Sequence, residues 1–326
     1  MMQLYFAPME GVTGYIYRNA HYQFFGGIDK YYMPFVSPSP HRHFTPRQLR
    51  DIAPAQNVAV PALPQLMTKN AEDFIWAANE LEQMGYREVN LNLGCPSGTV
   101  VSKGKGAGFL ADPEGLDRFF EKVFSSVRVP ISVKTRVGIH KVSEFSRLML
   151  VYNRYPIAEL TIHPRLQKDF YKGAVRKHVF VDAFAQSKNP ICYNGDLVTE
   201  ADITQLANEF PTVGSVMLGR GLIADPSLAA RAQGKPAADR NTLYAFHKSI
   251  YEQYTEAFGN KRNAMLRMKE IWFYHINLFD NNEKYGKNLR KTSDPRDFEA
   301  AMAAIYQDLP LRENAVPGWF RPAEDI

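Results

Sequence analysis

The sequence has few cysteines, no long apolar run and no excess of acidic residues. Of its 326 residues only 2 are cysteines, Cys95 and Cys192, and they stand far apart in unlike contexts. This excludes a disulfide framework and a cysteine-based zinc site, and no metal site is expected. The N-terminus also lacks the basic start and long apolar core of a signal peptide. We therefore expect a soluble cytoplasmic protein without a membrane span.

Positive charge is in slight excess and is unevenly distributed. The chain carries 39 Lys and Arg against 34 Asp and Glu. Between Lys261 and Lys291 there are eight basic and three acidic residues, and between Arg165 and Lys177 five basic and one acidic. This pattern favours a polyanionic partner, although an ordinary soluble surface shows a similar excess.

Eight short segments rich in β-branched or aromatic residues recur in the first two thirds of the chain, with turn residues after them. The expected strands are residues 4–7, 30–35, 59–66, 88–93, 131–135, 159–162, 190–193 and 215–218. Helical periodicity lies between them, at residues 70–84, 113–127, 142–155 and 200–208. This alternation predicts a (β/α)8 TIM barrel.

The last third of the chain has no strand signal. It predicts helices at residues 243–258, 264–279 and 295–306. The fold class is therefore α/β, a (β/α)8 TIM barrel followed by a small all-α helical bundle domain. We assign residues 1–235 to the barrel, 240–310 to the helical domain and 311–326 to an irregular tail, and take a monomer as the default.

Polar residues and glycines follow nearly every expected strand. Functional groups of such barrels lie at the C-terminal ends of the strands, so these residues would surround one site. Each alone has a plain structural explanation, but together they predict a functional ring: Pro8, Met9, Glu10, Gln65, Asn92, Cys95, Lys134, Arg136, His163, Arg165, Asn194, Gly195, Asp196, Gly219 and Arg220.

The ends of the last two strands predict a phosphate site. Their sequences are Asn194-Gly195-Asp196 and Gly219-Arg220-Gly221, in which glycines let backbone amides approach an anion. A phosphorylated cofactor would fit there. If it is a flavin, Lys134 would stand where negative charge gathers in the reduced ring, and Gln65 and Met9 would supply a hydrogen bond and an apolar face.

Cys95 begins a glycine-rich loop, residues 97–108, that contains no acidic residue. We expect this loop to be flexible and to close over substrate, with Lys103 and Lys105 meeting phosphates. A thiol with an ordinary pKa near ~8.5 is mostly protonated at neutral pH and suits general-acid catalysis. Cys192, inside a strand, is interpreted as a small buried hydrophobic residue.

Five stretches together resemble the tRNA-dihydrouridine synthases, in family order. They are Ala7-Pro8-Met9-Glu10-Gly11-Val12, Asn92-Leu93-Gly94-Cys95-Pro96-Ser97, Ser132-Val133-Lys134-Thr135-Arg136, Asn194-Gly195-Asp196 and Gly219-Arg220-Gly221. The resemblance implies an enzyme that uses NADPH to reduce FMN and then reduces the C5–C6 bond of uridines in the tRNA D-loop. FMN would be held by Pro8, Met9, Glu10, Gln65, Lys134, His163, Asn194, Gly195, Asp196, Gly219 and Arg220, and Cys95 would protonate C5.

The resemblance also implies a C-terminal helical domain that helps to grip tRNA. Candidate contacts to the RNA are Asn92, Lys103, Lys105, Arg136, Arg165, Lys261, Arg262, Arg267, Lys269, Lys287, Arg290 and Lys291. One departure is His163-Pro164-Arg165, where the family usually has Gly-Arg-Thr after the histidine. The sequence Met9-Glu10-Gly11-Val12 in the first stretch is more similar to the bacterial subgroup that modifies position 16.

Two other interpretations stay open at this level. A small-molecule FMN oxidoreductase of the dihydroorotate dehydrogenase type would need no basic helical domain. A non-catalytic tRNA-binding protein would carry no flavin and would tolerate Cys95→Ala. Deleting residues 241–306 should abolish turnover of tRNA but spare turnover of a small substrate.

Overall fold

The computed structural model describes residues 2–315, and its centre is one closed parallel sheet. The strands follow the order β3-β2-β1-β9-β8-β7-β6-β5-β4, and every neighbouring pair is parallel. They are β1 (Gln3–Phe6), β2 (Lys30–Tyr32), β3 (Ala62–Leu63), β4 (Gln65–Leu66), β5 (Val89–Leu93), β6 (Ile131–Arg136), β7 (Leu160–His163), β8 (Ile191–Tyr193) and β9 (Ser215–Leu218).

Nine strand segments occupy eight strand positions because Pro64 divides the third strand. β3 pairs with β2, β4 pairs with β5, and only Pro64 separates the two halves. Proline has no N–H to donate to a ladder, although its carbonyl still accepts the N–H of Asn90 at 2.9 Å. The two halves close the sheet, and the predicted TIM barrel is confirmed.

Side chains alternate between the two faces of the barrel wall, as the period of a strand requires. In β5, Val89, Leu91 and Leu93 are fully buried in the main apolar core, while the two asparagines between them face the other way and bond to polar side chains. A second apolar cluster contains residues of β1, β2, β8 and β9, among them Cys192, which is fully buried as predicted.

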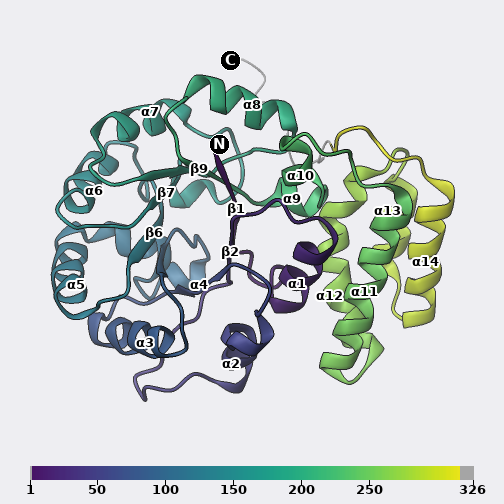
Figure 1. Ribbon diagram of the computed structural model, residues 1–326, viewed down its shortest axis with the longest axis horizontal. Coiled ribbons are helices and arrows are strands. Elements are labelled where there is room, and N and C mark those ends of the chain that lie inside the picture. Colours follow the sequence, from purple (N-terminus) through teal and green to yellow (C-terminus); the bar gives the residue numbers. More distant parts are fainter. Residues whose placement is uncertain (1, 316–326) are drawn as a thin grey trace.

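Helices surround the barrel (Figure 1). They are α1 (Tyr15–Phe24), α2 (Pro46–Ile52), α3 (Ala71–Gln83), α4 (Gly98–Val101), α5 (Pro113–Ser126), α6 (Glu144–Tyr152), α7 (Lys177–Gln186), α8 (Glu200–Glu209), α9 (Arg220–Ala224) and α10 (Leu228–Ala232). Side-chain caps on α3, α5 and α8 come from Asn70, Asp112 and Thr199. α1 and α7, which the sequence did not predict, have no side-chain cap and are rich in aromatic and β-branched residues.

The remaining helices form a bundle on one side of the barrel (Figure 1). They are α11 (Arg240–Phe258), α12 (Lys261–His275), α13 (Glu283–Lys291) and α14 (Pro295–Asp308). Phe246 of α11 lies against Tyr17, Phe24 and Phe25 of the barrel layer. The helical part of the predicted fold is confirmed, whereas the division into two domains at residues 235–240 stays a prediction.

Some expectations for this region need correction or fall outside the structure. α13 was missed because it contains a glycine and only two large apolar side chains, Tyr285 and Leu289; a side chain on Gly286 would lie 3.2 Å from Ile276. In the predicted tail, Leu311 forms an isolated bridge with Phe279, and residues 316–326 lie outside the described part. Within residues 2–315 no helix is long and apolar enough to cross a membrane.

Candidate active site

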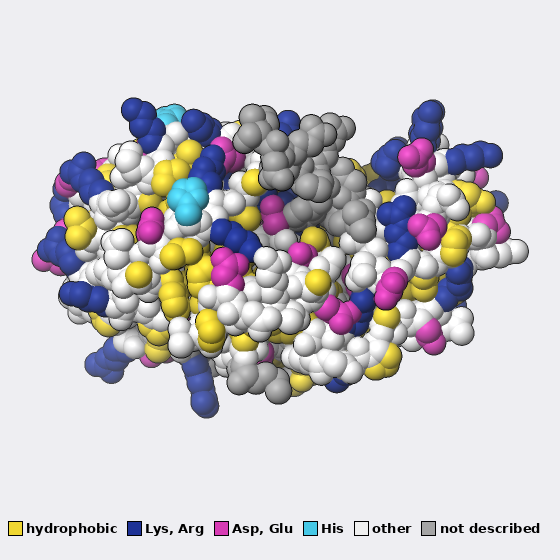
Figure 2. Space-filling view, turned by 90° about the horizontal axis from the view of Figure 1, so that it is seen from above, with side chains coloured by type: hydrophobic (Ala, Val, Ile, Leu, Met, Phe, Trp, Pro, Cys, Tyr) yellow, Lys and Arg dark blue, Asp and Glu magenta, His cyan; other side chains and the backbone are white. Residues whose placement is uncertain are grey.

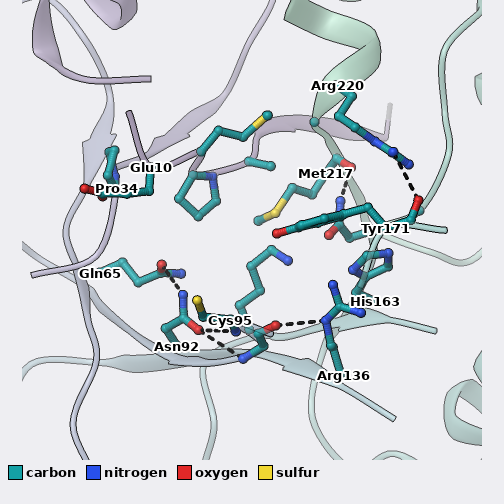
Figure 3. Close-up of a pocket in the computed structure, with 18 of the residues that line it drawn as sticks. Glu10, Pro34, Gln65, Asn92, Cys95, Arg136, His163, Tyr171, Met217 and Arg220 are labelled. Carbon is teal, nitrogen blue, oxygen red and sulfur yellow. Dashed lines mark hydrogen bonds between the residues drawn. The ribbon is translucent and has the colours of Figure 1, made fainter. Parts of the chain in front are cut away.

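A cavity of about 290 Å³ opens at the C-terminal ends of the strands (Figure 3). This is near the lower end of the roughly 300–1,000 Å³ of small-molecule sites. It is lined by all eleven residues expected to hold a cofactor and by Asn92, Cys95 and Arg136. The eleven are Pro8, Met9, Glu10, Gln65, Lys134, His163, Asn194, Gly195, Asp196, Gly219 and Arg220.

Two polar side chains fix the loop that carries Cys95. Asn92 Oδ1 accepts the backbone N–H groups of Gly94 and Cys95 at 3.0 and 2.9 Å, and Arg136 Nε donates to the Gly94 carbonyl at 2.9 Å. Burial raises the pKa of the Cys95 thiol above its usual value. The thiol is therefore protonated at neutral pH and can act as a proton donor.

The segment after Cys95 contains short helices where an irregular loop was expected, and its closing over substrate stays a prediction. It contains α4 and a 3-10 helix, Gly106–Ala111. Gly106 has φ +54°, and an added Cβ would lie 3.0 Å from the Cys95 Cβ, so glycine permits this close contact. Lys103 is exposed and Lys105 half-buried, and neither lines the cavity.

Lys134 extends from β6 into the cavity without a partner. Within residues 2–315 its ammonium group makes no hydrogen bond or ion pair, and burial, followed by the nearby Arg136, lowers its pKa to about 7. An anion bound beside this amine would restore its positive charge. The side chain is thus suited to respond to negative charge on a ligand.

The opposite side of the cavity combines an ion network with unbonded amides. Asp196 accepts from Arg165 Nη1 at 2.8 Å and from Arg220 Nη2 at 2.9 Å. The backbone N–H groups of Gly195, Asp196 and Gly219 have no hydrogen-bond partner within the described chain. Three such donors beside Arg220 form a concave surface that suits a phosphate.

Arg165 is too deeply buried to contact RNA directly. Its side chain is 2% exposed and donates to Asp196, to the Gly173 carbonyl and to His163 Nε2. Because a guanidinium only donates, His163 Nε2 is an acceptor, and the neutral ring carries its proton on Nδ1. Burial, and then the cation of Arg136, hold the pKa of His163 well below its usual value.

The model of the "Dihydrouridine synthase (Dus)" family matches residues 5–309. The chain belongs to this family. A "Probable tRNA-dihydrouridine synthase" of Staphylococcus epidermidis is 25% identical over 312 residues, which cover 91% of this chain and 94% of the relative. One of Rickettsia bellii is 24% identical over 315 residues, covering 94% and 95%. The prediction of a dihydrouridine synthase family enzyme is thereby confirmed.

Solved structures agree on the fold. Morphinone reductase in complex with tetrahydroNAD aligns with a TM-score of 0.51 and 14% identity, covering 74% of this chain and 89% of that chain. Histamine dehydrogenase from Rhizobium sp. 4-9 aligns with a TM-score of 0.54 and 12% identity, covering 71% and 45%. At these identities the likeness supports only the architecture of this dihydrouridine synthase family member.

Some residues at the site of this dihydrouridine synthase family member were not expected from its sequence. Tyr171 lies across the cavity, with the guanidinium carbons of Arg136 and Arg220 at 5.2 and 5.6 Å from its ring centre (Figure 3). It comes from the irregular segment after β7, where no periodic signal exists. Met217 also lines the cavity, and the alternation of β9 would have indicated it.

The basic residues of the helical bundle divide into two groups. Lys261, although exposed, pairs with Glu299, Arg267 donates to the Gly11 carbonyl, and Lys269 donates to the Thr292 carbonyl, so these three already have partners within the protein. The remaining candidates are exposed: Arg262, Lys287, Arg290 and Lys291. Figure 2 shows Lys and Arg side chains over this end of the molecule, on the right.

Proposed function

We propose that the protein reduces uridines of tRNA to 5,6-dihydrouridine, with hydride from FMN held in this cavity and a proton from Cys95. The observation that carries the proposal is that the Cys95 thiol and the Lys134 amine, which has no hydrogen-bond or ion-pair partner within residues 2–315, face one cavity whose other side suits an anion. Membership of the dihydrouridine synthase family and the names of the bacterial relatives support it.

The residues present fit FMN. The phosphate would lie against the unbonded N–H groups of Gly195, Asp196 and Gly219, with Arg220 beside them. The ring would contact Gln65 and the other residues expected from the sequence: Pro8, Met9, Glu10, Lys134, His163 and Asn194. When bound, FMN supplies the hydride for C6 of uracil, and NADPH would be the diffusible reductant.

The chain's own residues would place the substrate and move the proton. Uracil must leave its stack to enter the cavity, where Asn92 and Arg136 line the wall beside Cys95. The thiol gives its proton to C5 while C6 gains hydride, so the base gains two hydrogens and the C5–C6 double bond becomes single. The resulting thiolate then takes a proton from solvent.

The exposed basic residues would hold the RNA outside the cavity. Arg262, Lys287, Arg290 and Lys291 on the bundle, with Lys103 and the half-buried Lys105 on the barrel, would neutralise phosphates electrostatically. Action at position 16 and a monomeric state stay predictions.

The test is mass analysis with nucleotide mapping of dihydrouridine-free tRNA after incubation with the purified protein, FMN and NADPH. The proposal expects one D-loop uridine to gain two hydrogens, and Cys95→Ala to bind flavin but to stall. Flavin reduction with unchanged tRNA would instead support a small-molecule oxidoreductase of the dihydroorotate dehydrogenase type. Absence of flavin binding would support a non-catalytic tRNA-binding protein.

A further inference from the structure

A row of four polar side chains crosses the barrel wall beneath the cavity. Gln65 of β4 donates to Asn90 Oδ1 of β5 at 2.7 Å, Asn90 Nδ2 donates to Ser132 Oγ of β6 at 2.9 Å, and Asn92 Nδ2 donates to Gln65 Oε1 at 2.7 Å. Strand register places Gln65 beside Asn90 and Asn90 beside Ser132. Figure 3 shows the upper end of the row, where Gln65 and Asn92 meet.

The direction of every amide in the row follows from the backbone. Asn92 Oδ1 accepts two backbone N–H groups, from Gly94 and Cys95, and backbone nitrogen can only donate. Asn92 must therefore turn its Nδ2 toward Gln65, which meets it with Oε1. Gln65 Nε2 then faces Asn90 Oδ1, and Asn90 Nδ2 faces Ser132. No other set of amide orientations satisfies all of these contacts.

This row of hydrogen bonds determines which donors and acceptors remain available to a ligand in the cavity. Asn92 has used both lone pairs of its oxygen and one N–H, so only an N–H donor remains. Gln65 keeps one N–H of Nε2 and one lone pair of Oε1, because Oε1 accepts only from Asn92. Gln65, Asn90 and Ser132 are 0% exposed, so an amide turned the wrong way could not be compensated by bulk water.

We propose that Asn90 and Ser132 are positioning residues that hold Gln65 in the orientation that Asn92 sets, so that Gln65 and Asn92 both turn an N–H group toward the ligand, and that the ligand therefore presents a carbonyl oxygen there. This rests on the proposed function, because the 2,4-dione of a pyrimidine supplies such carbonyls both in a flavin ring and in uracil. Neither Asn90 nor Ser132 lines the cavity, so both act through Gln65.

The first test is a matched pair of substitutions at Ser132. Ser132→Ala removes the acceptor of Asn90 Nδ2, while Ser132→Thr keeps the hydroxyl on a side chain that strands favour. We expect Ser132→Ala to raise the dissociation constant of FMN, or KM for tRNA, about tenfold, as for one misdirected hydrogen bond. Ser132→Thr should stay within about twofold of the wild type.

A double-mutant cycle tests the indirect action. Asn90→Ala should also weaken FMN or tRNA about tenfold, but should add nothing in a Gln65→Ala background. A change in the FMN dissociation constant alone assigns the carbonyl to the flavin, and a change in KM for tRNA alone assigns it to uracil. Thr161→Val is the control, because Thr161 Oγ1 is buried in the neighbouring strand β7 without a hydrogen bond in residues 2–315.

A flavin-free measurement separates this inference from the proposed function. In protein labelled with [15N]glutamine, the side-chain N–H of Gln65 bonded to Asn90 should exchange slowly with solvent, and Asn90→Ala should abolish that protection. Thr161→Val should keep it. Fast exchange in the wild type, or equal ligand affinity in folded Ser132→Ala and Ser132→Thr proteins, would overturn the inference even if uridine reduction is observed.

Discussion

Asp196 holds two arginines with one carboxylate, and Asp196→Asn removes the charge while keeping the shape. Its backbone has φ +45°, a conformation that Asn tolerates as well as Asp, so the substitution adds no backbone strain. The Arg165 side chain is 2% exposed, and those of Arg220 and Asp196 are each 16% exposed. The substitution therefore leaves one guanidinium deeply buried without its counter-charge.

The cost follows from that burial. Removing one partner of a buried ion pair destabilises a protein by about 3–5 kcal/mol. Because Asp196 keeps some contact with solvent, we expect the low end, about 3 kcal/mol, and a fall in Tm of roughly 4 °C for a chain of 326 residues. Asp112→Asn is the matched control, since Asp112 is an exposed helix cap at which Asn serves equally well.

The assay is urea unfolding of the flavin-free protein, followed by circular dichroism and fluorescence together. The same series is repeated with inorganic phosphate, which should stabilise Asp196→Asn more than the wild type, because Arg220 then faces an anion site with one more net positive charge. A loss below about 1 kcal/mol, or equal stabilisation of both proteins by phosphate, would refute the electrostatic argument.

Three further predictions concern the thiol, the amine and the bundle. Cys95→Ala should lower turnover about 10²–10⁴-fold and leave flavin affinity unchanged. Because the pKa of the Cys95 thiol is raised, the wild-type rate should not fall between pH 7 and 8.5 through loss of the thiol proton, and a pH–rate profile checks this. Since the pKa of Lys134 is lowered to about 7, its amine should be mostly neutral at pH 8 in flavin-free protein. It should then react with trinitrobenzenesulfonate faster than surface lysines do, and bound FMN should protect it; peptide mapping of the labelled protein measures both. Changing Lys287, Arg290 and Lys291 to Ala should leave the reduction of FMN by NADPH unchanged but should weaken tRNA binding. The slope of the logarithm of the binding constant against the logarithm of salt concentration, measured by filter binding, should decrease in magnitude by about 1 for each lost phosphate contact.

The barrel and most of the cavity lining could be predicted from sequence for one physical reason. Parallel strands in a closed barrel bring their C-terminal ends to the same face, so residues at the ends of eight segments must converge wherever the helices between them lie. The lining role of Gln65, Asn92, Lys134 and His163 needed only the strand positions.

Other features depend on contacts that no local pattern contains. Arg165 was expected to contact RNA, but Asp196, 31 residues later, binds it in the interior. Tyr171 crosses the cavity because an ion pair between Asp169 and Arg176 closes the segment around it. Asn90 was missed although the alternating Val-Asn-Leu-Asn-Leu of β5 carried the signal, since period 2 places it on the same face as Asn92.

The two sides of the cavity are built with different interactions, and the difference bears on the proposed proton donation by Cys95. On one side Asp196 binds two arginines, whereas on the other the neutral amide of Asn92 and the guanidinium of Arg136 hold the loop of Cys95. An aspartate at position 92 would accept the same two backbone N–H groups, but its negative charge would raise the thiol pKa further. A neutral amide satisfies both donors without that charge, and these two donors also fix the direction of the amide and of the row that ends at Ser132.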